Sequence, residues 1–206
     1  MDGNHPLPLW NVTAFVLGTG PDLPADRLGR LEGYFTIGVN RIWRTGFVPA
    51  VSFWIDAGVY EENPIHFDRT LCVCDRSAAG RPEHIGLPMR AGPLPGYPNP
   101  NYLHHLANAG AAAALWAVAM GCYPVILLGM GGGDDGRGAG QLEAMRRDLR
   151  RLLAMRYAPP GAHHPALWAW DGPAEFDENM NHCHVQPARA GEMVAHIREF
   201  FSHGPI

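Results

Sequence analysis

Short apolar runs recur along the chain, and stretches compatible with helices separate several of them. The runs are Val12–Leu17, Phe35–Val39, Val51–Ile55, Leu71–Val73, Val125–Leu128 and Ala166–Trp170. Strands buried in a parallel sheet have this continuous apolar character, and their alternation with helices is typical of α/β proteins. We therefore expect one α/β domain with a mostly parallel sheet of about six strands and flanking helices.

Three longer segments are predicted to be helices. The clearest is an alanine-rich stretch from Asn108 to Met120, which meets Gly121 as a stop signal. The other two are Gln141–Arg156 and Ala188–Phe201. By contrast, residues at about 76–103 are rich in glycine and proline and show no sustained periodicity, so we expect a long loop that faces the substrate.

Composition favours a single globular domain over residues 1–206. The chain has 206 residues, 47% of them hydrophobic, and a formal net charge of -4. The apolar share is sufficient for one sizeable core, and the mild acidity argues against nucleic acid as the main partner. No apolar run approaches the roughly 20 residues that a membrane-spanning helix needs. We expect a cytoplasmic protein that binds a small molecule, and self-association stays open.

Cysteines and clustered histidines give no diagnostic metal site. The four cysteines are Cys72, Cys74, Cys122 and Cys183. They lack a zinc-binding spacing, and the first two share one face of a predicted strand, so buried free thiols are the favoured interpretation. The segment His182–His184 would place two histidines on one side of an extended chain, with His163 and His164 upstream. No third ligand stands at a diagnostic spacing, and we assign no metal ligand there.

The turn after the first apolar run is the most informative segment. It consists of Gly18, Thr19, Gly20 and Pro21, and a helix-like stretch follows that ends near Leu31. Such a turn at the carboxyl end of a strand exposes backbone N–H groups that can hold a phosphate. The turn lacks the third glycine of the dinucleotide fingerprint and the lysine of a P-loop, so neither NAD binding nor ATPase chemistry is indicated. A purely structural turn is the alternative.

Polar residues follow the next strands at the same edge of the expected sheet. Asn40 follows the second apolar run and Asp56 the third, where open α/β sheets bind ligands. Asn108 and Gly110 open the alanine-rich helix, whose N-terminus offers a second anion site. Each asparagine could instead cap the helix or turn that follows it.

The order of these motifs resembles a known family. The first strand is followed by a Gly-x-Gly-Pro turn, the second by Gly38-Val39-Asn40, and these are followed along the chain by an Asn-x-Gly helix start and a strand ending at Gly129. This order resembles phage and bacterial proteins that are related to Campylobacter-type sialyltransferases and to the MptE-like domain of archaeal pterin diphosphokinases. The resemblance covers roughly residues 12–60 and 104–135. It implies a Rossmann-like fold with its ligand crevice at the carboxyl ends of strands one, two, three and five. The nucleotide-binding residues would be Gly18, Thr19, Gly20, Pro21, Asn40, Arg41, Asp56, Asn108, Ala109 and Gly110.

The resemblance further implies nucleotide-dependent group transfer, with a nucleotide sugar as donor and an unidentified acceptor. Its sialyltransferases use a histidine base without a metal, and relatives usually carry an aspartate and then histidines soon after the glycine that corresponds to Gly129. This chain instead continues through a glycine-rich turn to Asp134 and Asp135. Either aspartate could act as the base or bind a Mg²⁺ ion that bridges a diphosphate, and a flexible polar turn is the alternative. His104 or His105 could also supply the base.

Two other functions stay open at this point. The pterin-kinase side of the resemblance implies diphosphate transfer from ATP to a small hydroxymethyl heterocycle, which would need a metal ion. The missing histidine favours a protein that binds a nucleotide without turnover. Hydrolysis of the donor would separate an enzyme from a binding protein.

Overall fold

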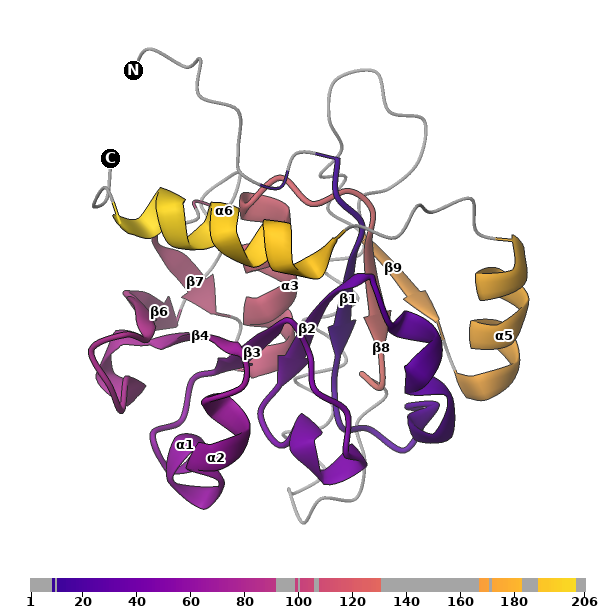
Figure 1. The fold of residues 1–206 in the computed structure, drawn as a ribbon, viewed down its shortest axis with the longest axis horizontal. Coiled ribbons are helices and arrows are strands. Elements are labelled where there is room, and N and C mark those ends of the chain that lie inside the picture. Colours follow the sequence, from indigo (N-terminus) through magenta and orange to yellow (C-terminus); the bar gives the residue numbers. More distant parts are fainter. Residues whose placement is uncertain are drawn as a thin grey trace.

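A computed structural model describes residues 9, 11–91, 99, 101–105, 108–130, 167–170, 172–182 and 189–202. Within this part of the chain, seven strands form one sheet in the order β5-β4-β3-β2-β1-β8-β9, and each neighbouring pair is parallel. The strands are β1 (Ala14–Leu17), β2 (Phe35–Val39), β3 (Val51–Trp54), β4 (Leu71–Asp75), β5 (Ile85–Leu87), β8 (Val125–Leu128) and β9 (Leu167–Trp170). The predicted α/β domain with a mostly parallel sheet is confirmed (Figure 1).

Helices cover both faces of this sheet. They are the 3-10 helices η1 (Ala25–Leu31), η2 (Ile42–Thr45) and η3 (Arg76–Ala78), and the α-helices α1 (Gly58–Glu62), α2 (Pro64–Phe67), α3 (Ala109–Ala119), α5 (Gly172–His182) and α6 (Ala190–Ser202). Side chains alternate along β1: Ala14 and Val16 join the core under α3 and α6, whereas Phe15 and Leu17 join the core under η1, η2 and α5. The chain therefore builds a three-layer α/β/α arrangement.

Two predicted segments differ from the structure. The loop expected at about 76–103 contains η3, β5 and a further strand, β6 (Met89–Ala91), which pairs in parallel with β7 (Leu103–His105) in a separate sheet. These three-residue strands are too short to give a periodic signal. His182 is the last residue of α5, so the extended segment expected there is wrong for this residue.

The predicted last helix is confirmed as α6. No helix in the described part of the chain has the length and apolarity to cross a membrane. Other predictions concern segments outside the described residues. The predicted helix at Gln141–Arg156 lies outside the described residues, as do Cys183, His184 and the pair His163 and His164.

Helix α3 lies wholly inside the protein, with all of its residues buried. At its start, the Oδ1 atom of Asn108 accepts a hydrogen bond from the N–H of Ala111 at 2.7 Å. At its end, Gly121 takes a φ of 92°, and the N–H groups of Gly121 and Cys122 return to the carbonyls of Val118 and Ala117, both at 3.0 Å. This is a Schellman motif, in which a left-handed glycine closes the helix. The Asn108 side chain thus caps the start of the helix, and the left-handed Gly121 ends it.

A third cluster of buried side chains lies under β3 and β4. It joins Trp54, Tyr60 and Phe67 with the free thiols of Cys72 and Cys74. The two cysteines share one face of β4, as predicted. Burial raises the pKa of Cys72 to about 11 and that of Cys74 to about 12, so both thiols stay protonated and unreactive near neutral pH.

Two histidines pack against the aromatic rings of this cluster. His66 lies beside Phe67 and is only 7% exposed, and His84 lies edge-on to Trp54 and Tyr60. His66 Nε2 and His84 Nδ1 are buried without a hydrogen-bond partner among the described residues. Burial lowers the pKa of each histidine, and Arg69 adds to the lowering at His66. At His84, Glu83 and Asp68 oppose this effect while Arg81 adds to it.

Replacing Asn108 by alanine should lower the free energy of unfolding by about 1 kcal/mol or more, because the cap is lost and the buried N–H of Ala111 is left unpaired. Asn63→Ala is the matched control, since Asn63 caps α2 through a longer contact of 3.4 Å to the N–H of His66. Urea unfolding of both variants measures the difference. Equal losses would show that the α3 cap has no special weight.

Stability should fall as the pH drops below about 6.5, the usual pKa of an unfolded-chain histidine. Since the folded-state pKa values of His66 and His84 are lowered, the unfolded chain binds protons first and acid favours unfolding. The double variant His66→Gln, His84→Gln should lose less stability between about pH 7 and pH 5.5 than the wild type. The exposed His196 on α6 provides the control His196→Gln. An unchanged pH dependence in the double variant would contradict this account.

Candidate functional site

The order of the strands places a topological switch point between β1 and β8. From β1 the chain crosses to β2 through η1 on one face of the sheet, whereas it reaches β8 through α3 on the other face. Figure 1 shows β1 and β8 side by side and pointing downward, so their carboxyl ends lie together at the bottom of the view. Open α/β sheets bind ligands at such a point, where the two crossovers diverge. We call the turns after β1, β2 and β8, together with the first turn of α3, the switch-point edge.

Gly18 and Gly20 bring the β1 turn against the β8 turn. Their N–H groups donate to the carbonyls of Leu128 and Gly129, both at 2.8 Å. A Cβ atom at Gly18 would overlap the Gly129 carbonyl oxygen, and one at Gly20 would lie 2.7 Å from it. Backbone packing therefore explains both glycines without a ligand, and their N–H groups are already engaged.

The rest of the turn is open to solvent. Thr19 and Pro21 are exposed, and the N–H of Thr19 has no acceptor among the described residues. Proline has no N–H to offer. Of the four turn residues predicted to hold a phosphate, Thr19 alone therefore has a backbone N–H that a ligand can accept from directly.

Met130 links three elements of the switch-point edge. Its Sδ atom would lie 2.9 Å from a Cβ atom at Gly18 and 2.8 Å from one at Gly110. The thioether thus lies between the β1 turn and the first turn of α3, where it is 9% exposed. The structure brings these two predicted segments together, with the Met130 side chain filling the space between them.

Two N–H groups in the first turn of α3 remain available. The side chain of Asn108 caps the helix by accepting a hydrogen bond from the N–H of Ala111, so the alternative of a helix cap is correct for this residue. The N–H groups of Ala109 and Gly110 have no acceptor among the described residues. Since the helix dipole adds partial positive charge here, this turn attracts an anion.

Asn40 carries an unpaired buried atom at the end of β2. Its backbone is left-handed, with a φ of 50°, and its N–H donates to the carbonyl of Phe53 at 2.9 Å. Its Oδ1 atom is buried and has no hydrogen-bond partner in the described part of the chain. An unpaired buried oxygen costs free energy, which a donor on a ligand would recover.

Arg41 and Asp56 have structural contacts of their own. Arg41 forms a two-pronged ion pair with Glu62 of α1, including a hydrogen bond of 2.7 Å from Nε to Oε2. This hydrogen bond lowers the pKa of Glu62. Asp56 is exposed, and its carbonyl accepts the N–H of Val59 at 3.1 Å where α1 begins. The ion pair engages the Arg41 guanidinium with α1.

Of the four predicted catalytic residues, the structure describes His104 and His105. Asp134 and Asp135 lie outside the described residues, on the segment that follows Met130. His104 and His105 belong to β7, in register with Arg90 and Ala91 of β6, shortly before α3 begins. Among the described residues, no group of three His, Cys, Asp or Glu side chains is arranged to hold a metal ion.

Sequence reasoning overlooked Met130. Its position directly after Gly129, at the end of the strand beside β1, was the available signal, because that position faces the switch point in a parallel sheet. A methionine there was not distinguishable from an ordinary core residue without the contacts to Gly18 and Gly110.

Comparisons of the chain with protein-family models, with curated proteins and with solved structures found no match. The resemblance to the sialyltransferase-related family therefore stays a prediction from the motifs.

Substituting alanine for Gly18 should destabilise the protein by about 1–3 kcal/mol, because the new methyl group meets the fixed Gly129 carbonyl. The matched control is Gly58→Ala, since a Cβ atom at Gly58 meets nothing within 4 Å. Chemical denaturation gives both values. If the two variants unfold alike, the close approach of the β1 and β8 turns is not a structural requirement.

Proposed function

We propose that the switch-point edge binds a nucleotide, and that the protein uses it for group transfer with a nucleotide sugar as the donor. The observation that carries this proposal is the switch point itself, where β1 and β8 end together and their crossovers leave on opposite faces. Nucleotides bind at this place in many doubly wound sheets. The fold by itself gives only an argument by analogy, so the proposal also depends on the polar groups at the edge.

Two sets of polar groups at this edge match the parts of a nucleotide, and Met130 lies between two of the segments that carry the edge. The N–H groups of Ala109 and Gly110, at the positive end of α3, suit a phosphate. The unpaired oxygen of Asn40 suits a donor on the ribose or the base. Met130 lies between the β1 turn and α3, and its unbranched side chain can rotate aside to admit the phosphate.

Group transfer also needs a proton acceptor. In sugar transfer, the acceptor hydroxyl attacks the anomeric carbon, the bond to the nucleotide phosphate breaks, and a base takes the hydroxyl proton. We propose Asp134 or Asp135 for this role, because their segment directly follows β8 at the switch point. Diphosphate transfer would use the same edge, with the aspartates holding Mg²⁺ instead.

The test is nucleotide binding by an Asn40→Gly variant, because glycine removes the amide and tolerates the left-handed backbone. The control is Asn11→Gly, since Asn11 also has a positive φ, of 62°, but precedes β1 at the opposite edge. We expect Asn40→Gly to weaken nucleotide affinity about tenfold or more, which corresponds to about 1.4 kcal/mol, and Asn11→Gly to leave it unchanged.

The screen uses CMP, UDP, GDP, ADP, their sugars and ATP, with and without Mg²⁺, and follows thermal unfolding. A ligand at a hundred times its dissociation constant adds about 2.7 kcal/mol of stability. Equal affinity in wild type and Asn40→Gly would remove the site from this edge. Donor hydrolysis that drops about a hundredfold in Asp134→Asn, Asp135→Asn would support transfer, and binding without turnover would leave a nucleotide-binding protein.

A further inference from the structure

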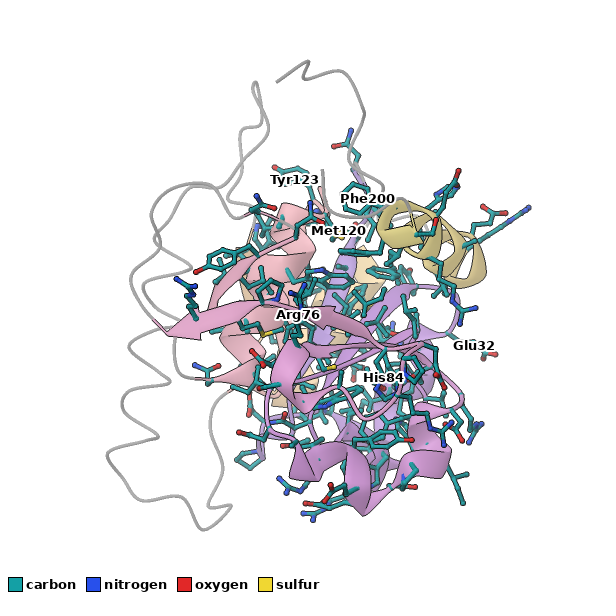
Figure 2. The ribbon with its side chains drawn as sticks, turned by 90° about the vertical axis from the view of Figure 1, so that its left-hand side faces the viewer. Glu32, Arg76, His84, Met120, Tyr123 and Phe200 are labelled. Atoms are coloured by element: carbon teal, nitrogen blue, oxygen red, sulfur yellow. The ribbon has the colours of Figure 1, made fainter. Side chains whose placement is uncertain are left out.

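A separate cavity of about 650 Å³ lies at the outer edge of the sheet, beside β5 and away from the switch point. Strands β4 and β5, the segment that joins them and the last turns of α6 line it. Figure 2 looks onto this side of the molecule, and its labelled residues Arg76 and His84 mark the region. The volume is within the range of about 300–1,000 Å³ that is usual for small-molecule sites.

The walls of the cavity combine apolar surface with arginine side chains. Phe67, Leu71 and Leu87 are buried residues of the lining, and Ile85 and Phe201 are partly buried ones. Three arginines line the same space, namely Arg76, Arg81 and Arg198. Apolar walls with a few polar groups are the ordinary composition of a ligand site.

The two carboxylates of the cavity lining both pair with one arginine. Arg81 pairs with Asp68 at 2.8 Å and with Glu83 at 3.6 Å, and it also lies over the ring of Tyr60. These two carboxylates are the acidic groups of the cavity lining. The other two arginines of the lining, which are exposed, have no carboxylate of the lining left to pair with.

Arg76 and Arg198 have no carboxylate partner among the described residues. Arg76 donates one hydrogen bond of 3.4 Å, from Nε to the carbonyl of Gly86, which leaves its two terminal nitrogens for a ligand. The guanidinium of Arg198, on α6, forms no ion pair or hydrogen bond with the described residues. The two guanidinium groups come from different walls of one cavity, and guanidinium groups bind carboxylates and phosphates through paired hydrogen bonds.

Gly86 contributes to this arrangement. A Cβ atom at Gly86 would lie 3.2 Å from the Cα atom of Arg76, so the absence of a side chain lets η3 pack closely on β5. His84 also lines the cavity, and burial lowers its pKa, so that it adds no positive charge near neutral pH. The charge available to a ligand is thus that of Arg76 and Arg198.

We propose that this cavity binds a small organic anion, a carboxylate or a phosphate monoester with an apolar body, between Arg76 and Arg198. The anionic group is held by the two guanidinium groups, and the apolar body lies against Phe201 and the partly buried Ile85. The site is independent of the switch-point edge and does not rest on the nucleotide proposal.

The test titrates the intact protein with phenyl phosphate, benzoate, inorganic phosphate and the neutral analogue benzyl alcohol, followed by NMR or calorimetry. The site variant is Arg76→Gln, Arg198→Gln. The control is Arg189→Gln, which removes one positive charge directly before α6, at a residue that pairs with Glu192 and lies outside the cavity lining. The single variants Arg76→Gln and Arg198→Gln match this control in charge. Circular dichroism establishes that each variant is folded.

We expect phenyl phosphate or benzoate to bind saturably and at least about tenfold more tightly than benzyl alcohol, with the stronger of the two identifying the anionic group. The site variant should lose about tenfold or more in affinity for that anion, while Arg189→Gln keeps it. Equal binding of anion and neutral analogue, no saturable binding, or an equal loss in the control would overturn the proposal. Asn40→Gly, which tests the nucleotide site, should leave this binding unchanged.

Discussion

Complete burial of α3 is the constraint on which the rest of the structure depends. A helix without water at its ends must have its backbone groups satisfied by the chain, and here Asn108 closes the start while Gly121 closes the end. Alanine fills most of the helix, which lets it lie close to β1, β2, β3 and β8. The N–H groups of Ala109 and Gly110 are the exception, and they lie at the switch point.

Packing and ligand binding make opposite demands on the switch-point edge. The β1 and β8 turns approach so closely that Gly18 and Gly20 have no room for a side chain, and their N–H groups are spent on this contact. What remains for a ligand is a narrow set of groups: the first turn of α3, the N–H of Thr19 and the unpaired oxygen of Asn40. The unbranched side chain of Met130 fills the space between the β1 turn and the first turn of α3.

The sequence predicts the fold well where strands are long and apolar. The runs at Phe35–Val39 and Val125–Leu128 match β2 and β8, and the alanine-rich helix matches α3, because burial on both faces removes polar residues from these segments. β5 was missed because three residues between a histidine and a proline carry no period. At the site, the motifs correctly indicated that the glycine turn and the start of α3 belong to one edge. No pattern could show that the carbonyls of the β8 end accept the N–H groups of Gly18 and Gly20, or that Glu62 pairs with Arg41.

The most direct measurement is an NMR titration with the nucleotide that stabilises the protein most, using backbone amides and methionine methyl groups as probes. The account predicts that the amides of Thr19, Ala109 and Gly110 and the methyl group of Met130 shift together and saturate at one affinity, because they surround one ligand. The amides of β5 and of the last turn of α6 should stay unchanged. Saturable shifts confined to β5 and α6, with Thr19 and Met130 unaffected, would contradict a nucleotide site at the switch point.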